Sequence, residues 1–447
     1  MTIELSDITF TIKADVIPPF GVEDIVNTGI SNTLAGNDII KGNSNNTIIT
    51  SPYTKEFTGL FNSGTLNTGD GNDILTGIFE DQDTSLKLNI SQINGIYNTF
   101  EGTIDTGNGN DIIKGLIQKD QDLGYTFNVA LLNDGTIYTD NGNDIIIGIN
   151  NDLFNYSRSG IMNRRSINTG NGNDTITGIT GWGTGIDSSG TINTGDGNDI
   201  IEGTAPLEGG KPTNGVGIFF NYYGTDTSIP VDTGRGNDII AGIGNTVGLE
   251  IYTTITTGDG NDTISGTGGV GEGFYNATGS VYTGDGNDFI TGTSRENYSI
   301  SNGNILKSAI IDTGDGNDVI TGIGTSGINN TGIINNTGII KTGNGNDSLI
   351  SVGFYGEGSV FLENGKDFLK GFGGGIFNGG NGQDTLELTK SGIYIIGISG
   401  TTVNFFVPGF ITTMQTSNFE ILIAGGTTYD FSSLTDGQII SIPYPSI

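Results

Sequence analysis

The sequence repeats a short glycine-rich phrase that ends on an aspartate, and this aspartate is the strongest candidate for a chemical role. Ten strong copies stay close to Thr-Gly-[Asp/Asn]-Gly-Asn-Asp and end at Asp73, Asp111, Asp144, Asp174, Asp199, Asp238, Asp262, Asp288, Asp318 and Asp347. Three weaker copies end at Asp38, Asp367 and Asp384. The aligned aspartates lie 17 to 39 residues apart, so the phrase marks the repeat unit of the chain.

The glycines of each phrase suit a turn that holds a hard cation. A glycine stands two residues before the aspartate in every copy, and another stands four before it in most. Glycine adopts positive φ readily, so successive carbonyls can point to one side. Carbonyls and one carboxylate make half of an oxygen cage for Ca²⁺, and a second turn about 4.8 Å away would supply the other half. The predicted metal-binding residues are Asp38, Gly69, Gly71, Asp73, Gly107, Gly109, Asp111, Gly142, Asp144, Gly170, Gly172, Asp174, Gly195, Gly197, Asp199, Gly234, Gly236, Asp238, Gly258, Gly260, Asp262, Gly284, Gly286, Asp288, Gly314, Gly316, Asp318, Gly343, Gly345, Asp347, Asp367 and Asp384.

Composition excludes several other kinds of chemistry. The chain has 447 residues with no Cys and no His, which removes disulfides, thiolate nucleophiles and imidazole catalysis. Its 17 Lys plus Arg stand against 49 Asp plus Glu, a formal net charge of −32. A field of that sign repels nucleic acids and anionic lipids. What remains is carboxylate, amide and backbone chemistry, which suits hard cations.

Apolar residues recur at fixed distances from the aspartate and indicate the elements that would position it. The residue two after it is always Ile or Leu, and the residue seven before it is apolar except in the first copy, where Ser31 stands. A third apolar group lies between the phrases, at Ile96, Phe127, Ile161, Ile186, Phe219, Leu249, Phe274, Ile300 and Ile328. Each repeat therefore predicts a turn and about three short strands, without a helical period.

These repeats predict an all-β fold, a right-handed parallel β-solenoid of about thirteen coils with a calcium column along one edge. The alternative is an antiparallel meander or barrel, because Asn-Gly and Asp-Gly favour hairpins. A hairpin needs only two special residues, whereas this phrase fixes about six, so we favour stacked coils. Residues 31–388 would form the solenoid. Residues 1–30 and 389–447 would cap its ends, since open ends expose strand edges.

The phrase resembles the nonapeptide Gly-Gly-x-Gly-x-Asp-x-U-x of the calcium-binding RTX (hemolysin-type) repeat, where U is a large apolar residue. Residues 194–202, for example, read TGDGNDIIE, and the likeness covers residues 33–388. Two positions depart from the family: its first Gly is Thr in most copies, and its second is Asp140 in one copy. RTX proteins usually carry two nonapeptides per coil. This chain has one per long repeat, so we expect a single calcium column on a wider, three-sided coil.

Charge favours many ions. Thirteen stacked turns enclose twelve gaps, and twelve Ca²⁺ would move the net charge from −32 to −8. Without metal, carboxylates about 5 Å apart would repel one another along the column. We therefore expect roughly nine to twelve Ca²⁺ and folding that depends on them. The alternative is that the turns are well-capped loops that bind no metal.

Other polar groups have simpler explanations than ligand binding. The residue three before the aligned aspartate is expected to face solvent, at Asp70, Asn108, Asn141, Asn171, Asp196, Arg235, Asp259, Asp285, Asp315 and Asn344. Such a column could touch ice, sugar or mineral, but some ice-binding RTX modules that resemble this layout carry Thr there, so a solvated edge is favoured. Asp81-Gln82-Asp83 and Asp120-Gln121-Asp122 would form an accessory cation site only if their loops stack.

A carbohydrate-binding, polysaccharide-cleaving or epimerising β-helix is the main alternative function. Arg164-Arg165 could meet an acidic sugar, although a loop salt bridge is simpler. Trp182 and Tyr222-Tyr223 could stack on sugar rings or pack on a coil face. No nucleophile, base and orienting group stand out together, so we expect no enzyme and assign no catalytic residue.

The favoured function is a secreted calcium-binding solenoid with a structural, surface or matrix role. The first twenty residues lack a Sec signal pattern, and no run near 18 apolar residues predicts a membrane span. Resemblance to RTX proteins implies bacterial type I secretion, with a signal in the last ~60 residues. Calcium outside the cell would then fold the chain. A polysaccharide or cell-surface partner and filament assembly remain open.

Overall fold

The computed structural model describes residues 2–18, 24–44, 48–51, 54–80, 90–118, 127–151, 158–205, 215–221, 230–303, 309–324, 333–335, 338–409 and 413–444. The chain divides into two compact units, Met1–Thr246 and Val247–Ile447. In the described residues, every element is a β-strand except two 3₁₀ turns, η1 (Leu5–Asp7) and η2 (Phe431–Ser433). The fold is all-β, as predicted, and no described helix is long and apolar enough to cross a membrane.

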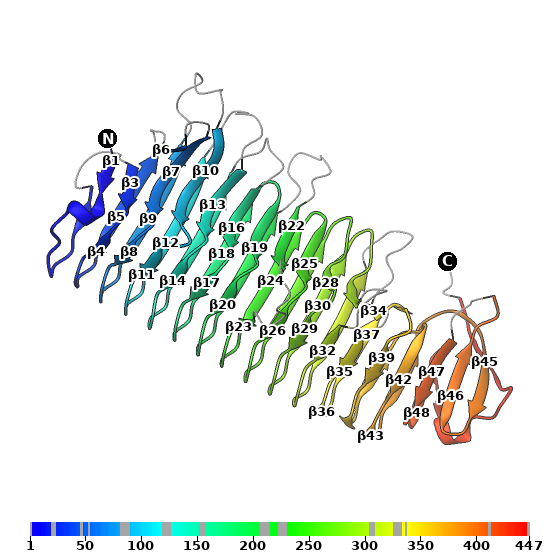
Figure 1. Cartoon of the computed structure of the whole chain (residues 1–447). Helices are drawn as coiled ribbons and strands as arrows, with labels where there is room; N and C mark the ends of the chain where they lie inside the picture. Colours follow the sequence, from blue (N-terminus) through cyan, green and yellow to red (C-terminus); the bar gives the residue numbers. More distant parts are fainter. Residues whose placement is uncertain are drawn as a thin grey trace. The chain divides into compact units, whose positions relative to one another are not determined.

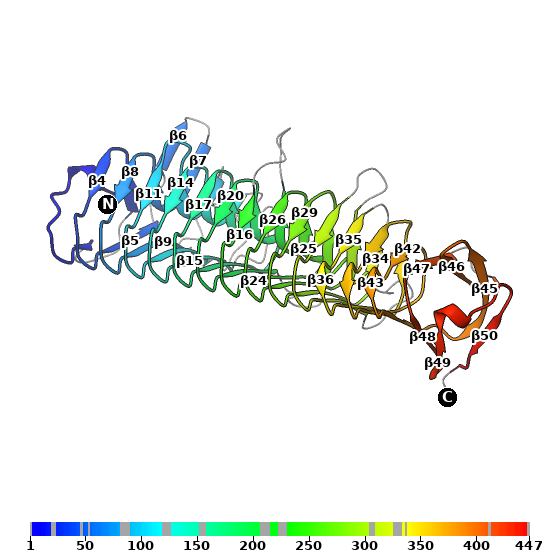
Figure 2. The same ribbon diagram turned by 90° about the horizontal axis from the view of Figure 1, so that it is seen from below.

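The first unit consists of coils of three strands, and equivalent strands of successive coils pair in parallel to form three sheets (Figures 1 and 2). Sheet A contains β1 (Thr2–Glu4), β3 (Asp24–Asn27), β7 (Thr54–Asn62), β10 (Ile90–Asn98), β13 (Phe127–Asn133), β16 (Arg158–Asn163), β19 (Thr184–Ser188) and β22 (Val216–Phe220), with β6 (Ile48–Ser51) antiparallel to β7. Sheet C contains β4 (Ile30–Asn32), β8 (Thr65–Asn67), β11 (Thr103–Asp105), β14 (Thr136–Tyr138), β17 (Ser166–Asn168), β20 (Thr191–Asn193) and β23 (Val231–Asp232). Sheet B contains β2 (Val16–Ile17), β5 (Ile39–Ser44), β9 (Ile74–Glu80), β12 (Ile112–Gln118), β15 (Ile145–Asn150), β18 (Thr175–Thr180), β21 (Ile200–Ala205) and β24 (Ile239–Gly244).

The second unit repeats this plan and ends in antiparallel strands. Its sheet A contains β25 (Val247–Ile251), β28 (Phe274–Asn276), β31 (Ile300–Asn302), β34 (Ile333–Asn335) and β38 (Phe354–Tyr355). Its sheet C contains β26 (Thr254–Thr256), β29 (Ser280–Tyr282), β32 (Ile310–Asp312), β35 (Ile339–Lys341), β39 (Ser359–Phe361), β42 (Gly375–Asn378) and β47 (Thr413–Ser417), and sheet B contains β27 (Thr263–Gly268), β30 (Phe289–Ser294), β33 (Val319–Gly324), β37 (Ser348–Ser351), β41 (Phe368–Lys370), β44 (Thr385–Leu388) and β48 (Ile421–Ala424). Short strands β36 (Asn344–Gly345), β40 (Asn364–Gly365) and β43 (Asn381–Gly382) pair within the turns. Antiparallel pairing involves β45 (Gly392–Ser399), β46 (Thr402–Phe406), β49 (Thr427–Asp430) and β50 (Ile439–Ile442).

Each coil runs from sheet A to sheet C, through the phrase, and into sheet B. This confirms the parallel solenoid, because the same residue of each repeat pairs with its own copy: Ile104 with Ile137, and Ile113 with Ile146. The apolar residues two after and seven before the aspartate point inward and are almost fully buried, as predicted. Each buried Ile or Leu contributes about 1.5–3 kcal/mol, so these two columns form the core.

The third apolar column was only partly predicted. Ile96, Ile161 and Ile186 are buried in one register on sheet A, but the intervening and following coils use Leu131 and Ile218. The prediction that Phe127 and Phe219 belong to this inward column is wrong, because both side chains lie on the outer face and are only half-buried. Variable loop length shifts the alignment before sheet A, and spacing from the phrase is lost there. Ile328 lies outside the described residues.

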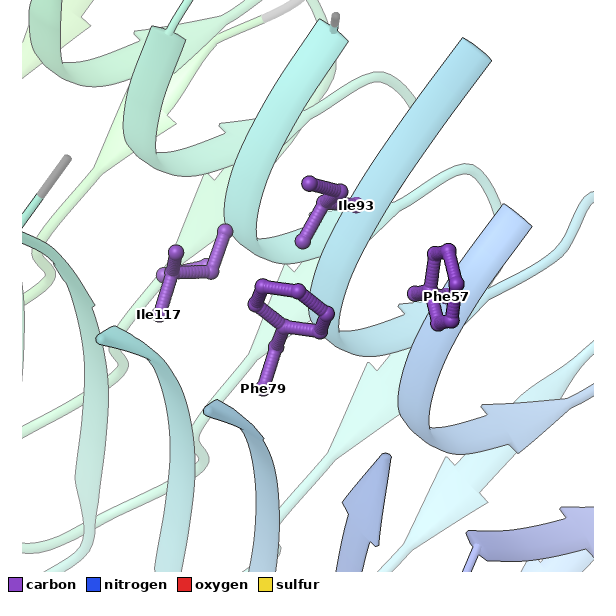
Figure 3. Close-up of a cluster of buried hydrophobic side chains, with 5 residues drawn as sticks. Phe57, Phe79, Ile93 and Ile117 are labelled. Atoms are coloured by element: carbon purple, nitrogen blue, oxygen red, sulfur yellow. The ribbon is translucent and has the colours of Figure 1, made fainter. Parts of the chain in front are cut away.

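An aromatic cluster fills the wide interior near the start of the first unit. Phe57, Phe79, Ile93, Ile117 and Ala130 form one buried group from sheets A and B (Figure 3). The rings of Phe57 and Phe79 lie 5.6 Å apart with a tilt of 60°. The neighbouring strands β7 and β9 have nine and seven residues, so large side chains are needed to fill the space between them.

Sheets A and B approach so closely in the middle of the coil that only glycine fits. The glycine four after the aligned aspartate faces the backbone of sheet A; at Gly178 an added Cβ would lie 2.1 Å from the Gly185 carbonyl oxygen. The same contact joins Gly148 to Gly160 at 2.1 Å. The sequence repeats this glycine at a fixed position, but it does not show that the glycine is needed for close packing, because that depends on the distance between two sheets.

Replacing this glycine should therefore destabilise the solenoid. We expect Gly178→Ala to lower the free energy of unfolding by about 1–3 kcal/mol or more, because the backbone of two sheets must move apart. Thermal unfolding followed by far-UV circular dichroism measures the loss. Gly397→Ala is the matched control, because its Cβ would come no closer than 3.7 Å to Asn404. Equal melting temperatures for both variants would contradict the close packing.

Candidate metal centre

The phrase forms the turn between sheet C and sheet B in every coil. Its first glycine has positive φ, 80° at Gly195, and Asp140 holds the same left-handed conformation with φ 56° where the family pattern has Gly. Its second glycine stacks on the previous turn: a Cβ on Gly172 would lie 1.4 Å from the Gly142 carbonyl oxygen. The turns are thus stacked copies, with glycine carbonyls directed along the stack.

The aligned aspartates form a buried column in each unit. Asp73 Oδ1 accepts a hydrogen bond from the Asp38 N–H at 2.7 Å, and the pattern continues through the first unit to Asp238 and through the second from Asp262 to Asp384, at 2.7–2.9 Å. The structure thereby brings the predicted carboxylates into register, one per coil. A carboxylate between two ions could offer one oxygen to each, but Oδ1 of these aspartates already accepts a backbone N–H.

The second oxygen of these carboxylates is buried without a hydrogen-bond partner. This holds for Oδ2 of Asp73, Asp111, Asp144, Asp174, Asp199, Asp288, Asp318, Asp347, Asp367 and Asp384. A buried unbonded carboxylate oxygen costs free energy unless a proton or a cation reaches it. At least ten orphaned oxygens in register are therefore the strongest sign of a missing positive charge.

The first turn and the last turn differ from the others. Asp38 Oδ1 accepts the Asp15 N–H at 2.6 Å, and its Oδ2 accepts the Thr33 hydroxyl. At the other end, the Asp384 N–H donates to Glu420 Oε2 at 2.7 Å. Asp15 and Glu420 lie outside the phrases, so sequence spacing gave no sign of either. Both oxygens of the Asp38 carboxylate are therefore hydrogen-bonded, unlike those of the ten aspartates named above.

Burial raises the pKa of the aspartates in the column. It raises the pKa of Asp111, Asp144, Asp199, Asp318 and Asp367 to about 7, and that of Asp73, Asp238, Asp347 and Asp384 to about 6. Hydrogen bonds oppose the rise, and the neighbouring carboxylates add to it at several positions, including Asp144 beside Asp111. The column is thus electrostatically strained when fully ionised.

A column of threonines explains one departure from the RTX pattern. The threonine five before the aspartate is buried, and Thr139 Oγ1 donates to the Thr169 carbonyl oxygen of the next turn at 3.2 Å. Thr139 also hydrogen-bonds the Asp144 carboxylate, which opposes the rise of its pKa. One hydroxyl proton serves both acceptors, so the threonine satisfies the carboxylate only in part, and Asp144 Oδ2 has no well-aligned donor. The sequence shows the conserved spacing of this threonine but not its partner.

The outward residues form polar ladders of their own. The asparagine one before the aspartate accepts a backbone N–H from the following turn; Asn110 Oδ1 binds the Asn143 N–H at 2.7 Å. The residue three before the aspartate is exposed in each strong copy, as predicted. Some of these residues are linked, as Asn141 is to Asn108 at 2.8 Å. The fixed Asn-Asp pair therefore satisfies backbone N–H groups in both directions along the stack.

The oxygen atoms of the turns suit a hard cation, provided that backbone carbonyls bind it together with the carboxylates. In the described residues, no three acidic side chains gather closely enough to hold a metal. The glycine carbonyls that point along the stack would have to supply the further oxygens. All of these oxygens are the kind that Ca²⁺ prefers. Carboxylates alone would not complete a site; carboxylates with turn carbonyls fit one.

The other candidate residues make local contacts or lie outside the described residues. Arg164 forms a salt bridge with Asp134 at 3.2 Å and lies 5.4 Å from the Phe127 ring centre, which supports the simpler interpretation of the basic pair. Arg165 donates to the Phe100 carbonyl oxygen at 2.7 Å. Trp182 is half-buried. The two Asp-Gln-Asp segments and Tyr222-Tyr223 are not among the described residues.

Comparison with known proteins finds a distant structural likeness. No family model matches the chain, and no curated protein matches it. One similar solved structure is that of a hyperactive, Ca²⁺-dependent, β-helical antifreeze protein from an Antarctic bacterium, at 17% identity and a TM-score of 0.37, covering 95% of this chain and 96% of the other. A likeness this weak says nothing about ligands, and the RTX resemblance stays a prediction from sequence.

The raised pKa values predict an unusual pH dependence of the metal-free protein. The aspartates titrate near 3.8 when unfolded but near 6 to 7 when folded, so the folded chain binds more protons between those values. In EDTA, the stabilisation from protonation should be lost as pH rises from about 4 to about 7.5. Urea unfolding followed by circular dichroism across this range measures it. A metal-free protein whose stability rises with pH would contradict the buried column.

Proposed function

We propose that this protein is a calcium-binding β-solenoid whose folding depends on cations held along the aspartate column. The observation that carries this proposal is the row of buried Oδ2 atoms without a partner. The aligned aspartates and turn glycines would hold the ions, one level between each pair of turns. Bound calcium supplies positive charge; the protein supplies oxygens, spacing and exclusion of water.

Two further properties support the cation over the alternative of an uncharged ladder. Protons could also neutralise the column, but pKa values of about 6 to 7 leave much of it ionised at neutral pH. The net charge of −32 also favours uptake of cations throughout the molecule. At neutral pH, a divalent ion is therefore the more effective way to relieve the repulsion.

A calcium requirement of this kind suits an extracellular protein. Millimolar calcium would load many sites at once, and the free energy of binding would be added to that of folding. We propose a secreted structural or surface role, and secretion with a C-terminal signal. No described constellation of residues supports assigning a reaction, so we propose no enzymatic activity.

Calcium titration of the metal-free protein tests the proposal at neutral pH. We expect a cooperative gain of β-sheet signal in far-UV circular dichroism, with about nine to twelve ions bound by isothermal titration calorimetry. Chelation should reverse the change. A chain that is fully folded in EDTA at pH 7.5, and that binds only one or two ions, would overturn the proposal in favour of a metal-free, hydrogen-bonded turn.

A matched pair of variants locates the ions within one turn. Asp199→Asn keeps an oxygen that can accept the Asp174 N–H but removes the buried charge, so we expect about one or two fewer ions and a higher calcium midpoint for folding. Asp196→Asn removes the same charge from the exposed face of the same turn and should change neither value. Equal effects of the two substitutions would show general charge screening instead of binding at the column.

A further inference from the structure

A cluster of tyrosines and glutamates lies on sheet A of the second unit, away from the phrase turns. Strands β25 and β28 lie side by side (Figure 1), and Glu250 pairs with Tyr275 across them. The same register continues to Ser301 on β31 and then through β34 to Tyr355 on β38. Because register places these residues in one row, they share the outer face of the sheet.

Four tyrosine rings form two pairs on this face. The Tyr252 and Tyr275 rings are 6.3 Å apart and nearly perpendicular, at 75°; those of Tyr298 and Tyr355 are 5.8 Å apart, at 50°. All four are only half-buried. Tyr275 and Tyr355 belong to the register row, whereas Tyr252 directly follows β25 and Tyr298 precedes β31. Together the rings offer flat apolar surface beside hydroxyl groups.

Two recessed carboxylates lie among these rings. Glu250 Oε1 accepts the Tyr252 hydroxyl at 2.9 Å, and Glu272 Oε1 accepts the Asn297 amide at 3.4 Å. Burial raises the pKa of both glutamates, and the charge of Glu272 adds to the rise for Glu250. The charge of Glu272 also acts on Tyr275 and Tyr298, so one acidic group lies near both ring pairs.

We propose that this face, formed by Glu250, Tyr252, Glu272, Tyr275, Tyr298 and Tyr355, binds a neutral glycan chain. The rings would stack on the apolar faces of sugar residues, and the carboxylates and the Asn297 amide would bind hydroxyl groups. Aromatic surface with a few fixed polar groups is the usual composition of such sites. The row crosses successive coils, so an extended chain would lie across the strands.

Charge and ring geometry favour a neutral sugar over other ligands. The two glutamates, on a chain of net charge −32, would repel an acidic polysaccharide. An organic cation needs several ring faces directed at one point. The Tyr252 and Tyr275 rings meet edge to face, so they leave no space between them for a cation.

Binding is tested with the full chain in calcium, by calorimetry against cellohexaose, laminarihexaose, maltohexaose and xylohexaose. We expect at least one of them to bind with Kd below about 1 mM, and neither trigalacturonate nor tetramethylammonium to bind in that range. Binding by none of the four sugars, or by tetramethylammonium alone, would overturn the proposal. Calcium-dependent folding is measured separately, so failure here leaves the aspartate column untouched.

Matched variants assign the binding to this face. Tyr275→Ala should weaken binding about tenfold or more, and Glu272→Gln several-fold, with circular dichroism unchanged. Tyr282→Ala is the control, because Tyr282 is 38% exposed in the same unit but on sheet C. If Tyr275→Ala does not fold, Glu272→Gln and Tyr298→Ala carry the test. Equal affinity in the folded face variants and in Tyr282→Ala would place binding elsewhere and refute the proposal.

Discussion

Stacking identical turns forces like carboxylates into a buried column, and the rest of the structure depends on how that column is neutralised. Parallel coils repeat at about 4.8 Å, so each residue lies beside its own copy. This favours apolar residues: Ile113 pairs with Ile146 in the core. For Asp111 and Asp144 it brings two charges together, with repulsion of about 3 kcal/mol at an effective dielectric constant of 20. Such a column needs protons or cations.

The turn satisfies its backbone with its own side chains, and this separates hydrogen bonding from charge. The aspartate N–H donates to the next turn, as Asp111 does to Asp144, while the asparagine N–H binds the preceding turn, as Asn143 does to Asn110. These opposed ladders explain why Asn-Asp is fixed even without metal. They leave the charge in place, however, and burial outweighs them in setting the pKa of Asp144. Hydrogen bonding of the turn backbone therefore does not explain the Oδ2 atoms, which lack a partner.

Sequence predicted those features that depend on distance from the phrase. Strands next to the turn keep a constant register relative to the phrase, so the inward residues Leu75 and Leu66 and the outward Asp70 could be placed by counting. Sheet A follows a loop of variable length, and there counting placed Phe127 inside when Leu131 takes that position. Contacts between sheets, such as that of Gly178 with Gly185, could not be predicted, because the spacing of residues in the sequence does not show which residue lies opposite. Handedness and the number of bound ions stay predictions, because spacing fixes neither.

The first and the last copy of the phrase lie where the column changes its hydrogen-bond partners, which limits how far cations can extend. Asp38 begins the first column with both oxygens bonded, one of them to Thr33, so its turn has the least need of an ion. Asp384 ends the second column against Glu420, a carboxylate that takes the place of the next aspartate without a phrase around it. An ion there would lack the glycine carbonyls of a following turn. Since cations need oxygens from both sides, the end turns should be the weakest sites, and the number of tightly bound ions should fall toward the lower end of the expected range.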